Sequence, residues 1–296
     1  MDPTASVALP DGRRLAFDDV GDPRGIPVLY LHGTPDCRLA RHPDDDVARQ
    51  AGIRLVAVDR PGAGGSTPHR GAGLTALGHD LLVLVDRLGI ERCALLGWSS
   101  GGLFALAAAT VLGARAPSVT LAATVPPVEA YDDDAVVESL SPERQHFVQL
   151  AHELAPDELG AELAGYLVPD PLDADLALAH VLEGPGDRGR RELAAVPGAA
   201  AQLARALPGA VAHGVEPLGH DVARQLEPGL DLGGVRASVR TVHGTEDGIS
   251  PPAVGRWLAE HLTAATVEVE VVDGAHHLLF PHWERLLRDA AGALGS

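Results

Sequence analysis

The clearest candidate nucleophile in the chain is Ser99, within the sequence GWSSG at residues 97–101. This turn lies between an apolar stretch at 93–96, typical of a buried strand, and a stretch at 101–112 that predicts a buried helix. A tight strand-to-helix turn exposes a serine hydroxyl, and glycines on either side remove side chains that would clash there. The start of the helix also favours developing negative charge. The pattern therefore favours a reactive serine over an idle turn residue.

A candidate acid follows a later apolar stretch. Residues 243–247, HGTED, come directly after the predicted strand 238–242. Loops at the carboxyl ends of parallel strands meet at one edge of a sheet, so a carboxylate here can reach Ser99. We expect Asp247 to be the acid, with Glu246 as the adjacent alternative. Both residues could instead be solvated loop acids.

A candidate base follows the last predicted strand, 267–272, in the sequence DGAHH at 273–277. A base must accept the serine proton, and an acid must orient it and stabilise its charged form. The chain order of serine, acid and histidine is the one this strand–turn–helix arrangement requires. His276 and His277 are both candidates, but adjacent side chains diverge in an extended loop, so only one can serve.

The sequence HGTP at 32–35 follows another predicted strand and opens at the same sheet edge. We expect the backbone N–H groups of Thr34 and Ser100 to form an oxyanion hole, where one donor is typically worth about 10²–10³ in rate. His32 is expected to be a packed residue that bonds loop carbonyls rather than a catalytic group.

Strands and helices alternate along most of the chain. This alternation predicts a mostly parallel sheet with helices on both faces. Strands are predicted at 7–9, 14–17, 28–31, 54–58, 93–96, 119–123, 238–242 and 267–272, and helices at 43–51, 74–88, 101–112, 253–262 and 283–293.

The stretch 126–232 contains no convincing strand and is expected to form an inserted helical cap. Ser141-Pro142 and Asp170-Pro171 each place a capping side chain before a proline at the first helical position, and Gly184 can end the second of these helices. Asp221 is expected to be a surface residue of this segment. The core would then consist of residues 1–125 and 233–296.

Five stretches together resemble the α/β-hydrolase superfamily, most closely bacterial members with a serine nucleophile and a helical cap. They are HGTP at 32–35, DRPGAGGS at 59–66, GWSSGG at 97–102, HGTEDGISP at 243–251 and GAHHLLFPHW at 274–283. The resemblance covers both core segments and does not extend over the cap. It implies an eight-stranded, mostly parallel sheet in which the second strand is antiparallel.

The resemblance also implies roles for single residues. It implies Ser99 as nucleophile, Asp247 as acid, and Thr34 and Ser100 as oxyanion donors. Members often have glycine just before the catalytic histidine, where this chain has alanine, but the downstream sequence LLFPHW favours His276. The expected reaction is hydrolysis of an ester-like bond in a small molecule. Carbon–carbon bond hydrolysis, acyl transfer or cyclisation, and non-catalytic ligand binding are the alternatives.

The composition limits the partners. The 296 residues include 41 acidic residues against 23 basic ones, all arginine, for a net charge of −18. Such a surface repels phosphate backbones and anionic lipid, so neither nucleic acid nor a membrane is an expected partner. The start of the chain lacks the features of a signal peptide, so we expect a cytoplasmic protein. The mechanism needs no cofactor or metal, and the oligomeric state is not specified by the sequence.

Overall fold

The protein is built around one sheet of eight strands, seen in a computed structural model that describes residues 5–71, 73–168, 172–184, 186–292 and 294. Each strand overlaps one predicted from apolar patterning. The strands are β1 (Ala5–Ala8), β2 (Arg14–Gly21), β3 (Ile26–Leu31), β4 (Ile53–Val58), β5 (Ala94–Trp98), β6 (Ser118–Ala122), β7 (Ser238–Gly244) and β8 (Val267–Val272).

The strands follow the order β1-β2-β4-β3-β5-β6-β7-β8. Strand β2 runs antiparallel to both of its neighbours, β1 and β4, and all the other pairs are parallel. The expected eight-stranded sheet with an antiparallel second strand is confirmed. The central strands are largely apolar because both of their faces are covered by helices.

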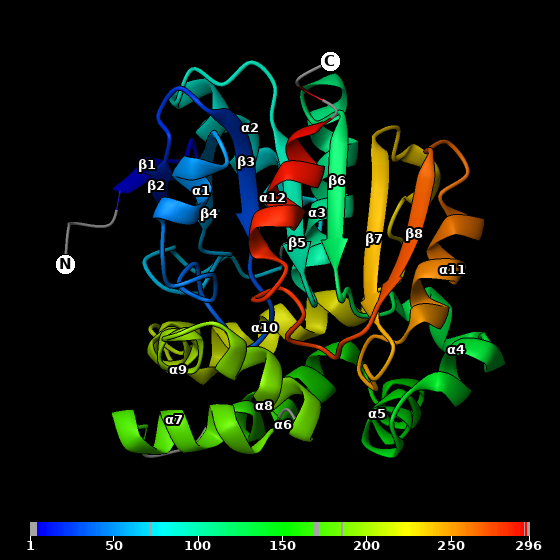
Figure 1. Ribbon diagram of the computed structural model, residues 1–296. Helices are drawn as coiled ribbons and strands as arrows, with labels where there is room; N and C mark the ends of the chain where they lie inside the picture. The colour runs from blue at the N-terminus through cyan, green and yellow to red at the C-terminus, as the bar shows by residue number, and fades with distance from the viewer. Residues whose placement is uncertain (1–4, 72, 169–171, 185, 293, 295–296) are drawn as a thin grey trace.

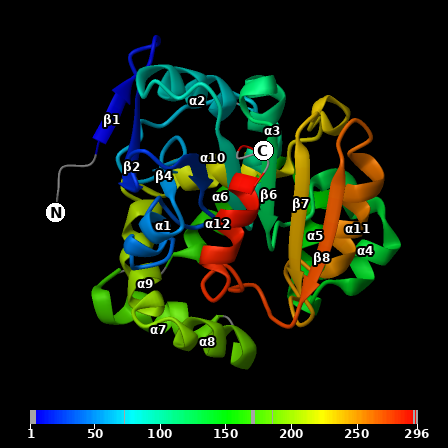
Figure 2. The ribbon, with the colours of Figure 1, turned by 45° about the horizontal axis from the view of Figure 1, so that its top comes forward.

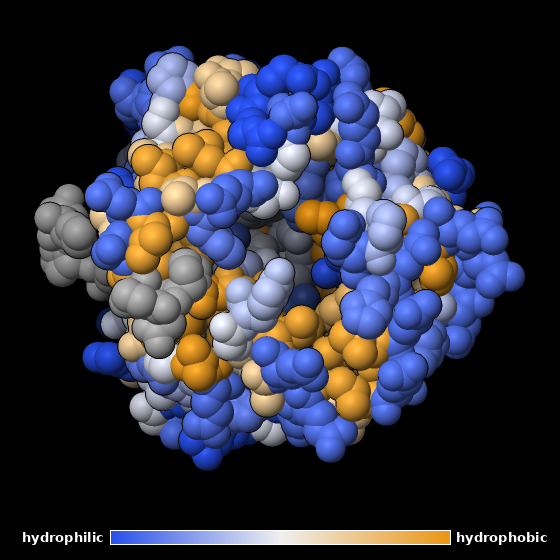
Figure 3. Space-filling view, turned by 90° about the horizontal axis from the view of Figure 1, so that it is seen from below, coloured by the Kyte–Doolittle hydropathy of each residue, from blue (hydrophilic) through white to orange (hydrophobic). Residues whose placement is uncertain are grey.

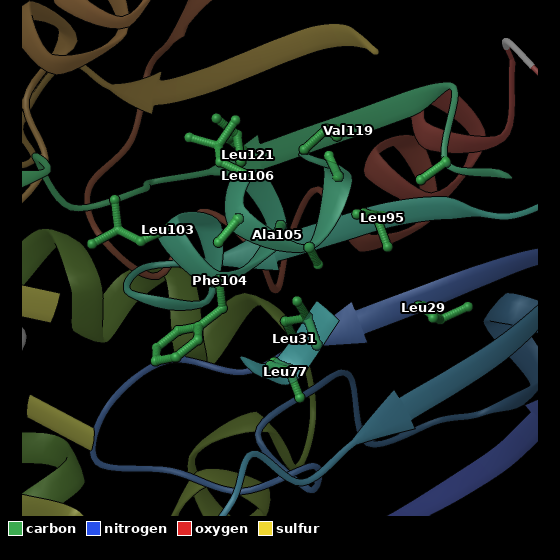
Figure 4. Packing of buried hydrophobic residues seen from close by; sticks show 14 of the residues in the cluster. Leu29, Leu31, Leu77, Leu95, Leu103, Phe104, Ala105, Leu106, Val119 and Leu121 are labelled. Atoms are coloured by element: carbon green, nitrogen blue, oxygen red, sulfur yellow. The ribbon is translucent and has the colours of Figure 1, made fainter. Parts of the chain in front are cut away.

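Helices cover both faces of the sheet (Figures 1 and 2). Helices α2, α3 and α11 contribute to one apolar cluster, and α1 and α12 to the other. Figure 4 shows part of the first cluster, in which Leu103, Phe104 and Leu106 of α3 lie among leucines of β3, β5 and β6. These helices are α1 (Asp46–Gln50), α2 (Ala76–Arg87), α3 (Gly101–Leu112), α11 (Pro252–His261) and α12 (Trp283–Gly292).

A helical segment runs from Val128 to Leu226 between β6 and β7, and Figure 1 shows it below the sheet. The predicted helix starting at Ser141-Pro142 is confirmed, and Gly184 ends α7 as expected. Asp170-Pro171 lies outside the described residues. The segment contains η2 (Val128–Asp132), α4 (Asp134–Ser139), α5 (Pro142–Glu153), α6 (Pro156–Leu167), α7 (Ala174–Glu183), α8 (Gly186–Ala195), α9 (Ala199–Ala210) and α10 (Val215–Leu226).

The register of the parallel strands brings their carboxyl ends level. Leu31 at the end of β3 pairs with Gly97 of β5, and Ala122 at the end of β6 pairs with Val242 of β7. Gly244, the last residue of β7, pairs with the last residue of β8. The loops that follow these strands therefore begin at one edge of the sheet, beside the helical segment. Within the described residues, every helix is too short or too polar to cross a membrane.

The close approach of β3 to the start of α3 requires glycine at position 101. A Cβ atom added to Gly101 would lie 2.1 Å from the carbonyl oxygen of Leu31. We expect Gly101→Ala to lower the free energy of unfolding by about 1–3 kcal/mol, because the backbone must shift to admit the methyl group. Urea unfolding would measure this change. Gly292→Ala, which meets no atom within 4 Å, is the matched control and should change stability by less than about 0.5 kcal/mol.

Candidate active site

Ser99 occupies the turn between β5 and α3 in a conformation that is unusual for a side chain other than glycine. Its φ angle is +54°, in the left-handed region. Its N–H donates to the carbonyl of Ala122 over 3.0 Å, and its own carbonyl accepts from the Thr124 hydroxyl over 3.1 Å. These bonds to the neighbouring strand hold the strained turn in place. The hydroxyl is thereby fixed at the sheet edge.

His276 lies between Ser99 and Asp247. Its Nε2 is 3.0 Å from the Ser99 Oγ, and its Nδ1 is 3.0 Å from Oδ2 of Asp247. The indole N–H of Trp98 donates to the His276 carbonyl over 3.0 Å, which fixes the backbone of this loop. The three side chains come from three loops far apart in sequence, and they form a continuous hydrogen-bonded row.

His277, the alternative base, does not contact Ser99. Its Nδ1 is buried and has no hydrogen-bond partner among the described residues. Burial, with a smaller contribution from the neighbouring His276, lowers the pKa of His277 to about 3. Its ring is therefore neutral at neutral pH. Of the adjacent pair, His276 is the one whose ring lies within hydrogen-bond distance of the Ser99 hydroxyl.

The carboxylate of Asp247 is buried, with the residue only 3% exposed. Its Oδ1 accepts the backbone N–H groups of Ile249 and Ser250, each over 2.9 Å. Burial alone would raise the pKa of Asp247, but His276 and these hydrogen bonds outweigh it, so the pKa lies below its ordinary value. Asp247 therefore stays ionised beside the imidazole. The side chain of Glu246, the competing acid, is 54% exposed and lies 3.8 Å from the Arg188 guanidinium.

The backbone N–H groups of Thr34 and Ser100 donate to no acceptor within the part of the chain that is described. Their side chains are tied together: the Thr34 Oγ1 lies 2.8 Å from the Ser100 Oγ. The same Thr34 oxygen lies 2.6–2.9 Å from polar atoms of Arg60, Asp221 and Gln225. The two free N–H groups thus belong to segments that are locked to one another and to helix α10.

The expectation that Asp221 is a surface residue is wrong. Its carboxylate forms a two-point ion pair with the buried Arg60, with Nε–Oδ1 and Nη2–Oδ2 distances of 2.8 and 2.6 Å. Arg60 also donates to the carbonyls of His32 and Gly33, directly before Thr34. The pairing was not predictable because its partners are 161 residues apart.

His32 is a packed residue, as expected. Its Nδ1 lies 2.8 Å from the carbonyl of Gly33, and its Nε2 accepts the backbone N–H of Arg60 over 3.1 Å. Burial, followed by the nearby Arg60 charge, lowers the pKa of His32 well below its ordinary value. The ring is therefore a neutral bridge between two loops, and it is not part of the row of Ser99, His276 and Asp247.

Glu192 of α8 is another residue that sequence reasoning missed. It is buried, and its Oε1 accepts the backbone N–H of Ala275 over 2.6 Å, next to His276. Burial raises the pKa of this carboxyl. No motif marks Glu192, because its partner is a backbone group. It attaches the helical segment to the histidine loop, much as Asp221 attaches it to the Thr34 loop.

Two cavities meet at Ser99 and His276. The first, of about 610 Å³, has Asp36, Glu143 and Glu246 in its wall and is called here the acid-lined pocket. The second, of about 240 Å³, is mostly apolar, contains Arg144, and is called here the Arg144 pocket. The two share the residues Thr34, Ser99, Leu167, Ile249 and His276.

The surface on the side of the helical segment is hollowed near its centre, and both hydrophobic and hydrophilic side chains surround the hollow (Figure 3). Among the described residues, no group of three or more His, Cys, Asp or Glu side chains is arranged to hold a metal ion.

Comparison with known proteins identifies the fold family. Residues 26–176 match the family model described as the alpha/beta hydrolase fold. Two similar solved structures are an enol-lactonase from Burkholderia xenovorans LB400 (TM-score 0.67, 18% identity, 99% of this chain and 100% of that chain) and a thermophilic esterase from Thermogutta terrifontis (TM-score 0.65, 22% identity, 99% and 98%).

The curated relatives match over a shorter stretch. A proline iminopeptidase from Xylella fastidiosa is 38% identical over 110 residues, which is 34% of this chain and 33% of the relative. The chain therefore spans about a third of the length of the curated relatives it matches. Because the family model matches just over half of the chain, and the eight-stranded sheet agrees with it, this protein belongs to the alpha/beta hydrolase fold family.

Proposed function

We propose that the protein is a serine hydrolase that cleaves an ester-like bond of a small-molecule substrate. One observation carries the proposal: the His276 imidazole lies 3.0 Å from both the Ser99 hydroxyl and the Asp247 carboxylate. A nucleophile, a base and an orienting acid at these distances can carry out acyl transfer. The backbone N–H groups of Thr34 and Ser100, which have no acceptor among the described residues, support the same reaction.

In the first half of the reaction, the Ser99 oxygen attacks the substrate carbonyl while Nε2 of His276 takes the hydroxyl proton. The carbonyl oxygen becomes negatively charged, and the N–H groups of Thr34 and Ser100 stabilise it. Asp247 stabilises the imidazolium and keeps Nδ1 protonated. The bond to the leaving group then breaks, and His276 gives its proton to the departing oxygen.

In the second half, water attacks the acyl group on Ser99. His276 takes a proton from this water, and the oxyanion is stabilised as before. The bond between Ser99 and the acyl carbon breaks, the proton returns to the serine oxygen, and the acid product leaves. The protein returns to its starting state, with the alcohol and the acid as products.

The helical segment serves in this proposal as the predicted cap, residues 126–232 over a core of 1–125 and 233–296. Contacts from Glu192 and Asp221 to the Ala275 and Thr34 loops support this division. Cap residues such as Arg144 and Leu167 also help to line the two pockets. The cap would thus select the substrate, and the loops at the sheet edge would perform the chemistry.

A series of p-nitrophenyl esters from acetate to decanoate tests the proposal. We expect saturable hydrolysis, with the highest kcat/KM for short and medium acyl chains. The Arg144 pocket of about 240 Å³ has room for roughly eight non-hydrogen atoms, at the ~30 Å³ that a water occupies in the liquid. If the folded protein hydrolyses none of these esters faster than buffer does, the proposal is wrong.

Asp221→Asn is expected to lower kcat by about 10- to 100-fold with a smaller change in KM. The substitution weakens the hold on Arg60, which fixes the carbonyls directly before Thr34, so an oxyanion donor loses its position. Steady-state kinetics would measure the effect.

Glu216→Gln is the matched control, because Glu216 lies on the same helix in an exposed pair with Arg70. Such pairs are worth at most about 1 kcal/mol, so the control should keep its activity. Equal kinetics for Asp221→Asn and Glu216→Gln would show that the buried pair does not position the site.

Hydrolysis of an N-terminal amide is a second candidate. The proline iminopeptidase from Xylella fastidiosa supports it, and so does the acid-lined pocket, whose Glu143 and Glu246 would suit an amine. L-proline p-nitroanilide tests this candidate against p-nitrophenyl butyrate. Activated esters are intrinsically more reactive than anilides, so a higher kcat/KM for the anilide would favour the amide reaction.

A further inference from the structure

The Arg144 pocket is a mostly apolar cavity. Its walls are formed largely by apolar side chains from the sheet edge and from the cap, including Leu103, Val125, Leu163 and Val222. The reacting pair of Ser99 and His276 forms one part of its lining, and Arg144 forms another. No Asp or Glu is among the described residues that line it. A ligand in this cavity therefore meets an apolar environment, a nucleophile and one cation.

Arg144 has no carboxylate within ion-pair distance among the described residues, although acids outnumber arginines 41 to 23 in the chain. Its guanidinium instead lies over the ring of Phe147, 4.4 Å from the centroid. The Phe147 ring is itself packed edge-on against Tyr131. A half-buried guanidinium held on an aromatic ring keeps its N–H donors available for an anion.

We infer that the substrate carries a carboxylate at the far end of its acyl chain and that Arg144 binds it. The inference rests on the proposed hydrolase function and specifies its substrate class. The chain between the two ends would lie against the apolar walls, and the ester carbonyl would reach the Ser99 oxygen. The distal carboxylate takes no part in the bond changes: the ester C–O bond breaks, water supplies the new hydroxyl, and the products are a dicarboxylic acid and an alcohol.

The charges of the two pockets fix the orientation of such a substrate. Glu143 and Glu246 in the acid-lined pocket would repel a carboxylate, whereas Arg144 would attract it. Asp36 adds little to this repulsion, because burial raises its pKa to about 8. The leaving group would therefore point into the acid-lined pocket. With room for roughly eight non-hydrogen atoms, the Arg144 pocket fits an acyl group of about the size of glutaryl.

Two esters of matched shape test the inference: monomethyl glutarate, and methyl 5-methylhexanoate, in which an isopropyl group replaces the carboxylate. The readout is the ratio of their kcat/KM values within each protein. We expect the ratio to exceed one for the wild type and to fall about ten- to hundredfold in Arg144→Met, as for the loss of a charged hydrogen-bonded pair. Arg144→Lys, which keeps the charge, should retain part of the preference.

Arg191→Met is the control, because Arg191 is an exposed arginine of α8 that lines neither pocket. It should leave the ratio at the wild-type value. A wild-type ratio below one, or an equal ratio in wild type and a folded Arg144→Met, would overturn the inference while hydrolysis of the neutral ester still supported the proposed function. If the wild type hydrolysed neither methyl ester and none of the p-nitrophenyl esters, the result would instead count against the proposed function itself.

Discussion

Ser99→Ala is expected to lower kcat/KM for p-nitrophenyl butyrate by about 10⁴–10⁶-fold, to a rate set by the remaining groups of the site. The loss is large because the serine oxygen forms the covalent bond to the acyl group, and alanine has no atom that can replace it. The side chain is small and the turn is held by backbone bonds, so the variant should fold. Steady-state hydrolysis at saturating and subsaturating ester would measure the change.

Ser100→Ala is the matched control for this experiment. Ser100 is the neighbouring serine, and its proposed contribution is a backbone N–H that alanine retains. Loss of its hydroxyl removes the 2.8 Å contact to Thr34, so we expect a decrease of at most about tenfold. An Ser99→Ala protein that keeps more than a few per cent of the wild-type activity would contradict the proposed nucleophile.

His276→Gln is expected to cost about 10⁴–10⁶-fold in kcat, similar to the loss of the serine, because the two residues act as a unit. Glutamine fills much of the same space but cannot take up the Ser99 proton. Combining Ser99→Ala and His276→Gln should then cost little more than either change alone. Measuring kcat for the two single variants and the double variant tests this expected non-additivity.

His277→Gln tests the alternative base that the sequence left open beside His276. His277 is a neutral, half-buried ring with a pKa of about 3, and it does not contact Ser99. We expect this variant to lose at most about tenfold in kcat, from changed packing around the loop. If His277→Gln were the more damaging of the two histidine variants, the assignment of the base to His276 would be wrong.

The alternation of strands and helices was predictable because each element is long enough to show its periodicity. Residues 55–58 of strand β4, for example, are a continuous apolar run, and α2 repeats its leucines at helical spacing. The strand boundaries differ from the predicted ones by a few residues: β2 continues to Gly21, beyond the predicted end at 17. Polar residues of an edge-side strand give no apolar signal, so its length was underestimated.

The loops at the sheet edge were predictable because each follows a recognisable strand. This placed Ser99, Asp247 and the histidine pair in one region. The strand positions alone do not say which imidazole faces the serine, and only the resemblance of LLFPHW to the family pattern favoured His276. Which ring faces the serine depends on the torsion angles of the loop, and the sequence of two adjacent histidines does not specify these angles. The hydrogen bond from Trp98 to the His276 carbonyl is one of the contacts that fix this loop.

The contacts between the helical segment and the loops at the sheet edge were not predictable. Two contacts show why: Arg60 pairs with Asp221, and Ala275 bonds to Glu192. In each contact the two residues are far apart in sequence, and no motif links them. An isolated acidic residue on a helix is most often solvated, so the sequence predicts a surface position for Asp221. For the same reason it does not single out Glu192. The two pockets form where the helices of this segment pack over the sheet edge. The residues that line them could not be predicted for the same reason.

The most direct test of the account is to treat the protein with a fluorophosphonate and to map the modified residue by peptide mass spectrometry. The account predicts rapid addition of one phosphonyl group, on the serine at position 99. The reaction should be absent in Ser99→Ala and strongly slowed in His276→Gln. A folded protein that forms no adduct, or one modified only at another residue, would contradict the central claim that this hydroxyl is an activated nucleophile.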